Sequence, residues 1–350
     1  MANVKDGSSS LTIVLFTYPQ SVVGRRMDWY LTLREIPYVH CTVDNKMPRP
    51  VLSRLNVQYR RIPVLAIGRD IYCDSREQIQ MLETLWTESP RLGADPKTQS
   101  YQKGVERLME NWAFDGGVFW RTASMIPGDA LLVQDPKWVD DREEMTGRRF
   151  TKEGMQAGLP DALAHTRLHL QIVEDCLLAD GREWIAGGKE PSLADVHIGW
   201  AFDWMLRPSK LMGMRDVYPD LLNEKNYPRT FKWIERIGKA VEDARKRNGN
   251  LKVLTDDEAV KMIENSGYYE LEHLEIDEKD PTGLKKGQET DIFPTDMASG
   301  FVHRDSGKLV GLTVNSVTVQ TKTTGGAEVR IHYPRTNIKV AEAVKKGPNL

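Results

Sequence analysis

Residues 60–75 read Arg60-Arg61-Ile62-Pro63-Val64-Leu65-Ala66-Ile67-Gly68-Arg69-Asp70-Ile71-Tyr72-Cys73-Asp74-Ser75. Proline lacks the backbone N–H that a sheet interior needs, so Pro63 is expected at the start of a strand. Gly68-Arg69-Asp70 separates two short apolar runs and predicts a hairpin. Ser75 and Gln78 have the spacing of a capping box, which predicts a helix with Ser75 as its N-cap.

This order of strand, strand and capped helix resembles the glutathione-binding half of the glutathione S-transferases. The resemblance implies that Pro63 is cis and that Val64 offers its backbone to the cysteinyl part of glutathione. It also implies that Asp74 and Ser75 hold the γ-glutamyl end, where a helix N-terminus presents free N–H groups to a carboxylate. The simpler alternative is that Ser75 only caps the helix and that Pro63 is a trans strand opener.

Size and charge limit the classes of function. A chain of 350 residues is expected to form two or three domains, and its 48 basic and 50 acidic residues nearly cancel. Such a balance predicts neither nucleic-acid nor membrane binding, and favours a small-molecule or protein partner. Three cysteines, a polar N-terminus and no apolar run of membrane-spanning length predict a cytoplasmic protein.

The first domain is expected over residues 1–88. The apolar run Leu11 to Phe16 predicts a buried strand, and a helix is expected from Ser21 to Arg34. A second strand over 38–43 and a short helix over 48–56 complete a βαβαββα order, which is the thioredoxin-like arrangement.

A helical domain is expected over 97–250, with a polar insertion from Gly128 to Arg149. Ser192-Leu193-Ala194-Asp195 resembles the N-capping box of the core helix in the same family, which assigns Ser192 and Asp195 a structural role. Residues 251–350 predict a linker helix and a small β-rich domain that resembles the barrel-like extension of some fungal transferase-like proteins. The expected fold class is therefore α/β plus α, with an added β domain.

Catalysis by glutathione needs its thiolate, because a thiol with a pKa near ~8.5 is mostly protonated at neutral pH. Lowering this pKa by about two units requires ~2.7 kcal/mol, which one hydrogen bond and a helix N-terminus can supply. In the resemblance, Ser21 falls on the catalytic position, although Val22 and Val23 replace the usual proline and aromatic residue. Tyr18 is the competing hydroxyl, and a plain N-cap is the alternative role of Ser21.

The remaining site predictions concern the residues that bind glutathione and those that line the electrophile pocket. The predicted glutathione contacts are Arg61, Ile62, Pro63, Val64, Asp74 and Ser75. Among them Arg61 is expected to bind the glycine carboxylate, with Arg60, Arg54 and Lys46 as rivals. Trp112, Phe119 and Trp120 are expected to line an apolar electrophile pocket, although each could equally belong to the helical core. His165 and His169 lack a third ligand, so no metal is predicted.

Three functions follow. The first is a glutathione transferase that adds the thiolate to an apolar electrophile. The second is a glutathione-dependent isomerase or lyase in small-molecule, secondary-metabolite biosynthesis, which uses the same contacts. The third is a non-catalytic interaction module. A homodimer is possible, although the added domain could block the interface.

Overall fold

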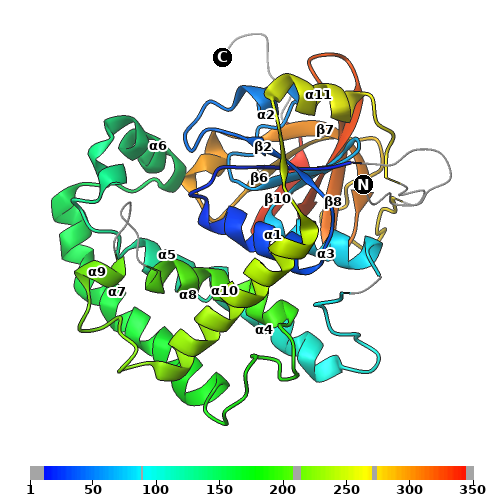
Figure 1. Cartoon of the computed structure of the whole chain (residues 1–350). Helices are drawn as coiled ribbons and strands as arrows, with labels where there is room; N and C mark the ends of the chain where they lie inside the picture. Colours follow the sequence, from blue (N-terminus) through cyan, green and yellow to red (C-terminus); the bar gives the residue numbers. More distant parts are fainter. Residues whose placement is uncertain (1–11, 88–89, 208–213, 270–273, 344–350) are drawn as a thin grey trace.

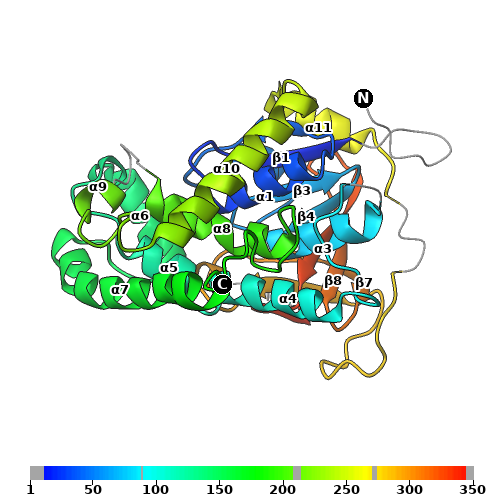
Figure 2. The same ribbon diagram turned by 60° about the horizontal axis from the view of Figure 1, so that its bottom comes forward.

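The computed structural model describes residues 12–87, 90–207, 214–269 and 274–343. Residues 1–11, which include Leu11 and the polar N-terminus considered above, and 344–350, which end the predicted third domain, lie outside this description. The helices of the middle of the chain lie to one side of a long sheet built from both ends of the chain (Figures 1 and 2). No helix among the described residues is both long and apolar enough to span a membrane.

The N-terminal part has the predicted thioredoxin-like order. Its elements are β1 (Ile13–Thr17), α1 (Val22–Leu33), β2 (Val39–Thr42), α2 (Pro50–Arg54), β3 (Val64–Ile67), β4 (Asp70–Cys73) and α3 (Ser75–Leu85). β1 pairs with β2 in parallel and with β3 antiparallel, and β3 and β4 form the hairpin. Gly68, in the turn, has a φ of 58°, which glycine adopts at no steric cost.

The start of α3 differs from the prediction in its cap. Asp74, not Ser75, is the N-cap, and its Oδ1 accepts a hydrogen bond from Arg76 N at 2.9 Å. The predicted capping box is wrong because Gln78 turns inward, where its Nε2 donates to the carbonyls of Pro63 at 2.8 Å and Tyr72 at 2.9 Å. Gln78 therefore joins the helix to both strands of the hairpin. The Ile62–Pro63 peptide is cis, as the resemblance implies.

The helical part is built around one buried helix, α8 (Leu193–Leu206), in which every residue is buried. Its predicted capping box is confirmed, since Ser192 and Asp195 satisfy each other's backbone groups. Asp195 also accepts from Trp233 Nε1 at 2.8 Å, which ties α8 to α10. The other elements are α4 (Ser100–Phe114), α5 (Val118–Ala123), η1 (Leu131–Gln134), α6 (Pro136–Thr146), α7 (Lys152–Ile172), the π-helical turn η2 (Val173–Leu177), α9 (Met214–Val217) and α10 (Pro228–Asn248).

The C-terminal part extends the first sheet. Its elements are β5 (Lys252–Leu254), α11 (Asp256–Glu264), β6 (Glu289–Pro294), η3 (Ala298–Phe301), β7 (Asp305–Leu312), β8 (Ser316–Lys322), β9 (Glu328–Pro334) and β10 (Ile338–Glu342). The strand order is β10-β6-β7-β8-β9-β4-β3-β1-β2-β5. The added β-rich unit is thus confirmed, and its strands continue the thioredoxin-like sheet.

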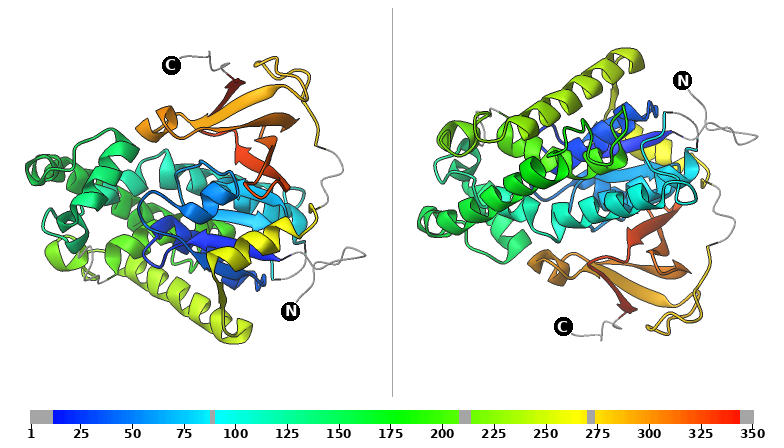
Figure 3. Two further views of the ribbon diagram at one scale, coloured as in Figure 1. Left: turned by 90° about the horizontal axis from the view of Figure 1, so that it is seen from above. Right: turned by 90° about the horizontal axis from the view of Figure 1, so that it is seen from below.

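Both edges of the four-stranded sheet are covered in this way. β9 pairs in parallel with β4, and β5 pairs in parallel with β2. Unpaired edge strands are prone to unwanted pairing, so this extension protects the first domain. Figure 3 shows the orange and red strands on one side of the blue and cyan sheet and α10 on the other.

Candidate active site

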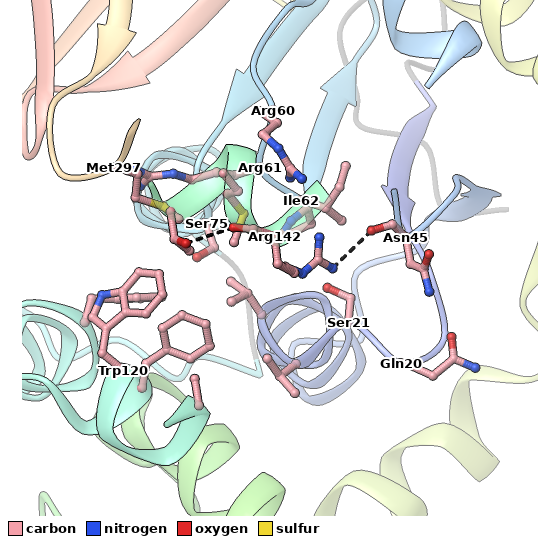
Figure 4. A pocket seen from close by; sticks show the side chains of 18 of the residues that line it. Gln20, Ser21, Asn45, Arg60, Arg61, Ile62, Ser75, Trp120, Arg142 and Met297 are labelled. Carbon is pink, nitrogen blue, oxygen red and sulfur yellow. Dashed lines mark hydrogen bonds between the residues drawn. The ribbon is translucent and has the colours of Figure 1, made fainter. Parts of the chain in front are cut away.

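A cavity of about 210 Å³ lies where the three parts of the chain meet. Nine of the predicted site residues line it: Tyr18, Ser21, Arg61, Ile62, Pro63, Asp74, Ser75, Phe119 and Trp120. Val64 and Trp112 are not among the lining residues. Figure 4 shows Ser21, Ser75 and Trp120 around this space.

Ser21 lies at the N-terminus of α1, just after β1 and a short turn. Its backbone is extended (φ −68°, ψ 114°), and its Oγ accepts a hydrogen bond from Gly24 N at 3.0 Å. Ser21 therefore is an N-cap, yet a serine hydroxyl also carries one proton to donate. Among the described residues no acceptor takes that proton, and the side chain faces the cavity. Tyr18 lines the same cavity, so both candidate hydroxyls are brought to it.

Asp74 and Ser75 form the second helix N-terminus at the cavity. Asp74 has a φ of 72°, uncommon for a residue with a side chain, and Tyr59 OH donates to its Oδ2 at 3.3 Å. Ser75 Oγ accepts from Arg26 Nη1 at 2.8 Å. Arg26 is fully buried and also binds Glu110 Oε1 at 2.7 Å; its burial lowers the pKa of the guanidinium, while Glu110 raises it. This ion pair fixes the Ser75 side chain in place.

Arg61 reaches the cavity but already has a partner. Its Nη1 lies 3.1 Å from Asp296 Oδ2, and its Nη2 contacts the other carboxylate oxygen. Asp296 follows β6 in the C-terminal part, and it lines the cavity together with Met297. Sequence reasoning missed both residues, because no local pattern shows that a loop so far along the chain returns to this site.

The rivals of Arg61 divide into two groups. Arg60 lines the cavity, and its Nη2 lies 2.5 Å from Asp141 Oδ2 on α6. Arg54 and Lys46 are not lining residues, and they pair with Asp257 and Asp135 at 2.7 and 2.8 Å.

The apolar wall comes from α5 and α8 and from the predicted insertion between them. Phe119 and Trp120 lie in α5. Their rings pack edge to face, with their centroids 4.7 Å apart. Trp112 instead belongs to the helical core, since its Nε1 donates to His169 Nδ1 at 3.3 Å. Burial lowers the pKa of His169 to about 4, with the neighbouring charges of His165 and Arg121 adding to the effect. Apolar lining residues that sequence reasoning did not name as site residues are Ala123, Ile126, Leu132, Trp138, Met145, Phe150 and Trp204.

Comparisons with known proteins find related sequences for two parts of the chain. A family model described as "Glutathione S-transferase, N-terminal domain" matches residues 15–90, and one described as a domain of unknown function (DUF7962) matches residues 121–246. "Glutathione S-transferase U1" of Arabidopsis thaliana is 24% identical over 227 residues, which are 65% of this chain and 84% of that protein.

Two solved structures show the same fold. A GST-like protein from Pseudomonas syringae has a TM-score of 0.65 at 21% identity, covering 95% of this chain and 99% of its own. This coverage includes most of the added strands, so the extension also occurs in a bacterial protein. Rice GST1, solved in complex with glutathione, has a TM-score of 0.50 at 14% identity, covering 73% of this chain and 96% of its own. The N-terminal family-model match, the curated relatives and the shared fold together support placing the chain in the glutathione S-transferase superfamily.

Proposed function

We propose that the chain binds glutathione in this cavity and adds its sulfur to an apolar electrophile. The observation that carries the proposal is the meeting of two helix N-termini at one cavity, with Ser21 on α1 and Ser75 on α3. A helix N-terminus favours a negative charge, and glutathione offers two of them near these positions, a thiolate and the γ-glutamyl carboxylate. One cavity thus provides for both groups.

Ser21 would stabilise the thiolate. Its hydroxyl proton is free to be donated while Oγ keeps its bond to Gly24 N. A hydrogen bond to a charged group contributes ~1.5–3 kcal/mol and the helix dipole up to ~1 kcal/mol, which together lower the thiol pKa by about two units. The thiol proton leaves to solvent, and a sulfur lone pair then forms the bond to the electrophilic carbon. In an addition the π bond at that carbon breaks and its far atom takes a proton from solvent, whereas with 1-chloro-2,4-dinitrobenzene the C–Cl bond breaks and chloride leaves.

Ser75 and Asp74 would hold the γ-glutamyl end. Ser75 Oγ accepts from Arg26, so its own proton can be donated to the carboxylate. Asp74 lines the cavity with a carboxylate that can accept from the ammonium group. Pro63 and Ile62 would flank the cysteinyl part, and the backbone of Val64 keeps the role that the resemblance implies. Rice GST1 supports this use of the fold, since it was solved with glutathione.

The apolar wall would hold the electrophile. Trp120 lies on the helical side of the cavity, across from Ser21 on α1 (Figure 4), and Phe119 lines the cavity from the same helix as Trp120. Apolar walls of this kind bind ligands by burying their surface. The cytoplasm is the compartment we propose, where free thiols such as Cys41, Cys73 and Cys176 stay reduced. A homodimer is also a proposal, and it would have to use a surface other than the β4 edge, which β9 covers.

The test measures glutathione binding by calorimetry and the pKa of the bound thiol by ultraviolet titration of the thiolate. We expect Ser21→Ala to raise the thiol pKa by one to two units and to lower conjugation of 1-chloro-2,4-dinitrobenzene roughly 10–100-fold near pH 6.5. Ser21→Asp keeps an N-cap but places an anion beside the sulfur, so it should fold normally and lose activity. Ser124→Ala, outside the cavity, is the control.

Each other outcome has a definite meaning. Full activity in Ser21→Asp would reduce Ser21 to a helix cap, and a loss confined to Tyr18→Phe would assign the role to Tyr18. Glutathione that is recovered unchanged while a substrate is converted would indicate isomerisation or elimination at the same site. If the folded wild-type chain binds no glutathione, the enzymatic proposal is wrong and an interaction module is favoured.

A further inference from the structure

We propose that Arg49, Arg60 and Arg142, here called the arginine cluster, bind a carboxylate of the second substrate. The electrophile would then be an aromatic or similarly apolar acid rather than a neutral compound. Its description as a substrate rests on the proposed transfer reaction, whereas the binding itself does not depend on glutathione.

The arginine cluster is assembled from three separate segments. Arg49 is the N-cap residue of α2, Arg60 precedes β3, and Arg142 lies in α6 of the helical part. All three line the cavity. Figure 4 shows the side chains of Arg60 and Arg142 directed toward the same region, next to Asn45 and above Ser21.

Among the described residues a single carboxylate, that of Asp141, contacts the cluster, and it reaches two of the three guanidinium groups. Asp141 lies 2.5 Å from Arg60 Nη2, and it also contacts Arg142 Nη1. Arg49 donates instead to two backbone carbonyls, those of Asp44 at 2.9 Å and of Arg60. The cluster therefore carries more positive charge than its carboxylate neutralises.

The acidic groups nearby have other partners. Asp135 pairs with Lys46 at 2.8 Å, and Glu144 pairs with His303 at 2.7 Å. Burial lowers the pKa of the Arg60 guanidinium, whereas the charge of Asp141 and, more weakly, that of Glu144 raise it. Three guanidinium groups thus face the Asp141 carboxylate and, more weakly, that of Glu144, which leaves an excess of positive charge.

The excess charge is also buried. Arg49 and Arg60 are only 3% and 2% exposed, and Arg60 Nε has no hydrogen-bond partner among the described residues. Burial lowers the pKa of the Arg49 guanidinium to about 10, and repulsion from Arg60 adds to this effect. Buried charges without partners are costly, and an anion that accepts from the cluster would remove this cost. Guanidinium groups match a carboxylate in geometry, because each can donate two parallel hydrogen bonds.

An apolar chamber adjoins the cluster. Trp138, Leu132 and Met145 line the cavity from the insertion that carries Arg142, and Phe150 lines it directly after the insertion. The guanidinium of Arg142 lies over the Trp138 ring, 5.0 Å from its centroid. A ligand that fits both features has a carboxylate at one end and a ring or chain of carbon atoms at the other.

The test compares two probes of nearly the same size and shape, 4-phenylbutyrate, which carries a carboxylate, and 4-phenylbutyramide, which carries a neutral amide. Their binding to the full chain is measured by calorimetry at low ionic strength in a buffer without phosphate or carboxylate. We expect the acid to bind wild type at least about tenfold more tightly than the amide, and Arg142→Gln to remove most of that preference while the amide affinity stays unchanged. Arg335→Gln is the matched control, because it breaks an ion pair with the buried Asp280 away from the cavity. Melting curves verify that each variant is folded.

Three results would overturn the inference. In the first, acid and amide bind equally. In the second, neither binds the folded wild type. In the third, Arg142→Gln weakens glutathione but not γ-glutamylcysteine and leaves the acid unaffected, so that the cluster holds the glycine carboxylate of glutathione. Failure of the proposed function is a separate observation, namely that wild type binds no glutathione.

Discussion

Replacing Asp296 with asparagine is expected to tighten glutathione binding. Arg61 is the predicted partner of the glycine carboxylate, and it is held at both terminal nitrogens by Asp296. The glycine carboxylate of glutathione must therefore displace the Asp296 carboxylate from Arg61. Asp296→Asn keeps the size of the side chain but removes the competing charge.

The size of the effect follows from the exposure of this pair. The side chains of Arg61 and Asp296 are 19% and 28% exposed, so their attraction is partly screened by water. Ion pairs of this kind contribute about 0.5–1 kcal/mol. Because this is the free energy that glutathione must overcome at Arg61, its loss should lower the Kd for glutathione about two- to fivefold.

Calorimetric titration of wild type and Asp296→Asn with glutathione and with γ-glutamylcysteine measures this change. Only glutathione should bind more tightly, because γ-glutamylcysteine lacks the glycine that would reach Arg61. Asp291→Asn is the matched control, since this residue is on the neighbouring strand β6 and accepts from Ser306 Oγ at 2.6 Å outside the cavity. An unchanged glutathione affinity in Asp296→Asn, or an equal gain for both ligands, would refute the reasoning.

Three further changes test the site from other directions. Gln78→Leu should lower the free energy of unfolding by about 2–4 kcal/mol in urea titrations, because the carbonyls of Pro63 and Tyr72 lose a buried donor. Burial raises the pKa of Glu77 to about 8, above its unfolded value of about 4.3, so the folded state favours the protonated form. The contribution of the protonated Glu77 carboxyl to the free energy of unfolding is full below about pH 4 and is lost as the pH rises through about 8. The free energy of unfolding of Glu77→Gln should therefore depend less on pH across that range. Trp120→Ala should raise the KM for an apolar electrophile several-fold while the Kd for glutathione stays unchanged, and the reverse pattern in steady-state kinetics would remove Trp120 from the electrophile pocket.

Local sequence patterns predicted the elements that local interactions determine. Ser192 and Asp195 satisfy each other within one helical turn, and Ser21 caps its own helix, so both caps depend on residues that are close together in the sequence. The cap of α3 was assigned to the wrong neighbour, because Asp74 and Ser75 are both good capping residues and the sequence does not show that Gln78 turns inward. Capping rules rank residue types but do not locate tertiary partners.

The parts of the site that sequence reasoning missed depend on contacts between distant segments. Gly128 to Arg149 looked like a polar insertion, yet it folds into η1 and α6 and supplies Arg142 and part of the apolar wall. Asp296 reaches the cavity only because the late strands attach to β4, and no periodicity near Asp296 reports this attachment. Trp112 was predicted to line the cavity but packs in the helical core. An aromatic residue on an amphipathic helix can do either, and the sequence does not show which.

The parallel pairing of β4 with β9 has a consequence for how the chain matures during synthesis. His332 and Asp70, which share a 2.8 Å contact across this junction, are 262 residues apart. At a translation rate of roughly 5–20 residues per second, the ribosome needs on the order of 13–50 s to make the second partner after the first. The nascent first domain therefore spends that interval with the β4 edge unpaired, and ribosome-bound chains stalled before β9 should bind chaperones more strongly than chains that have released β9.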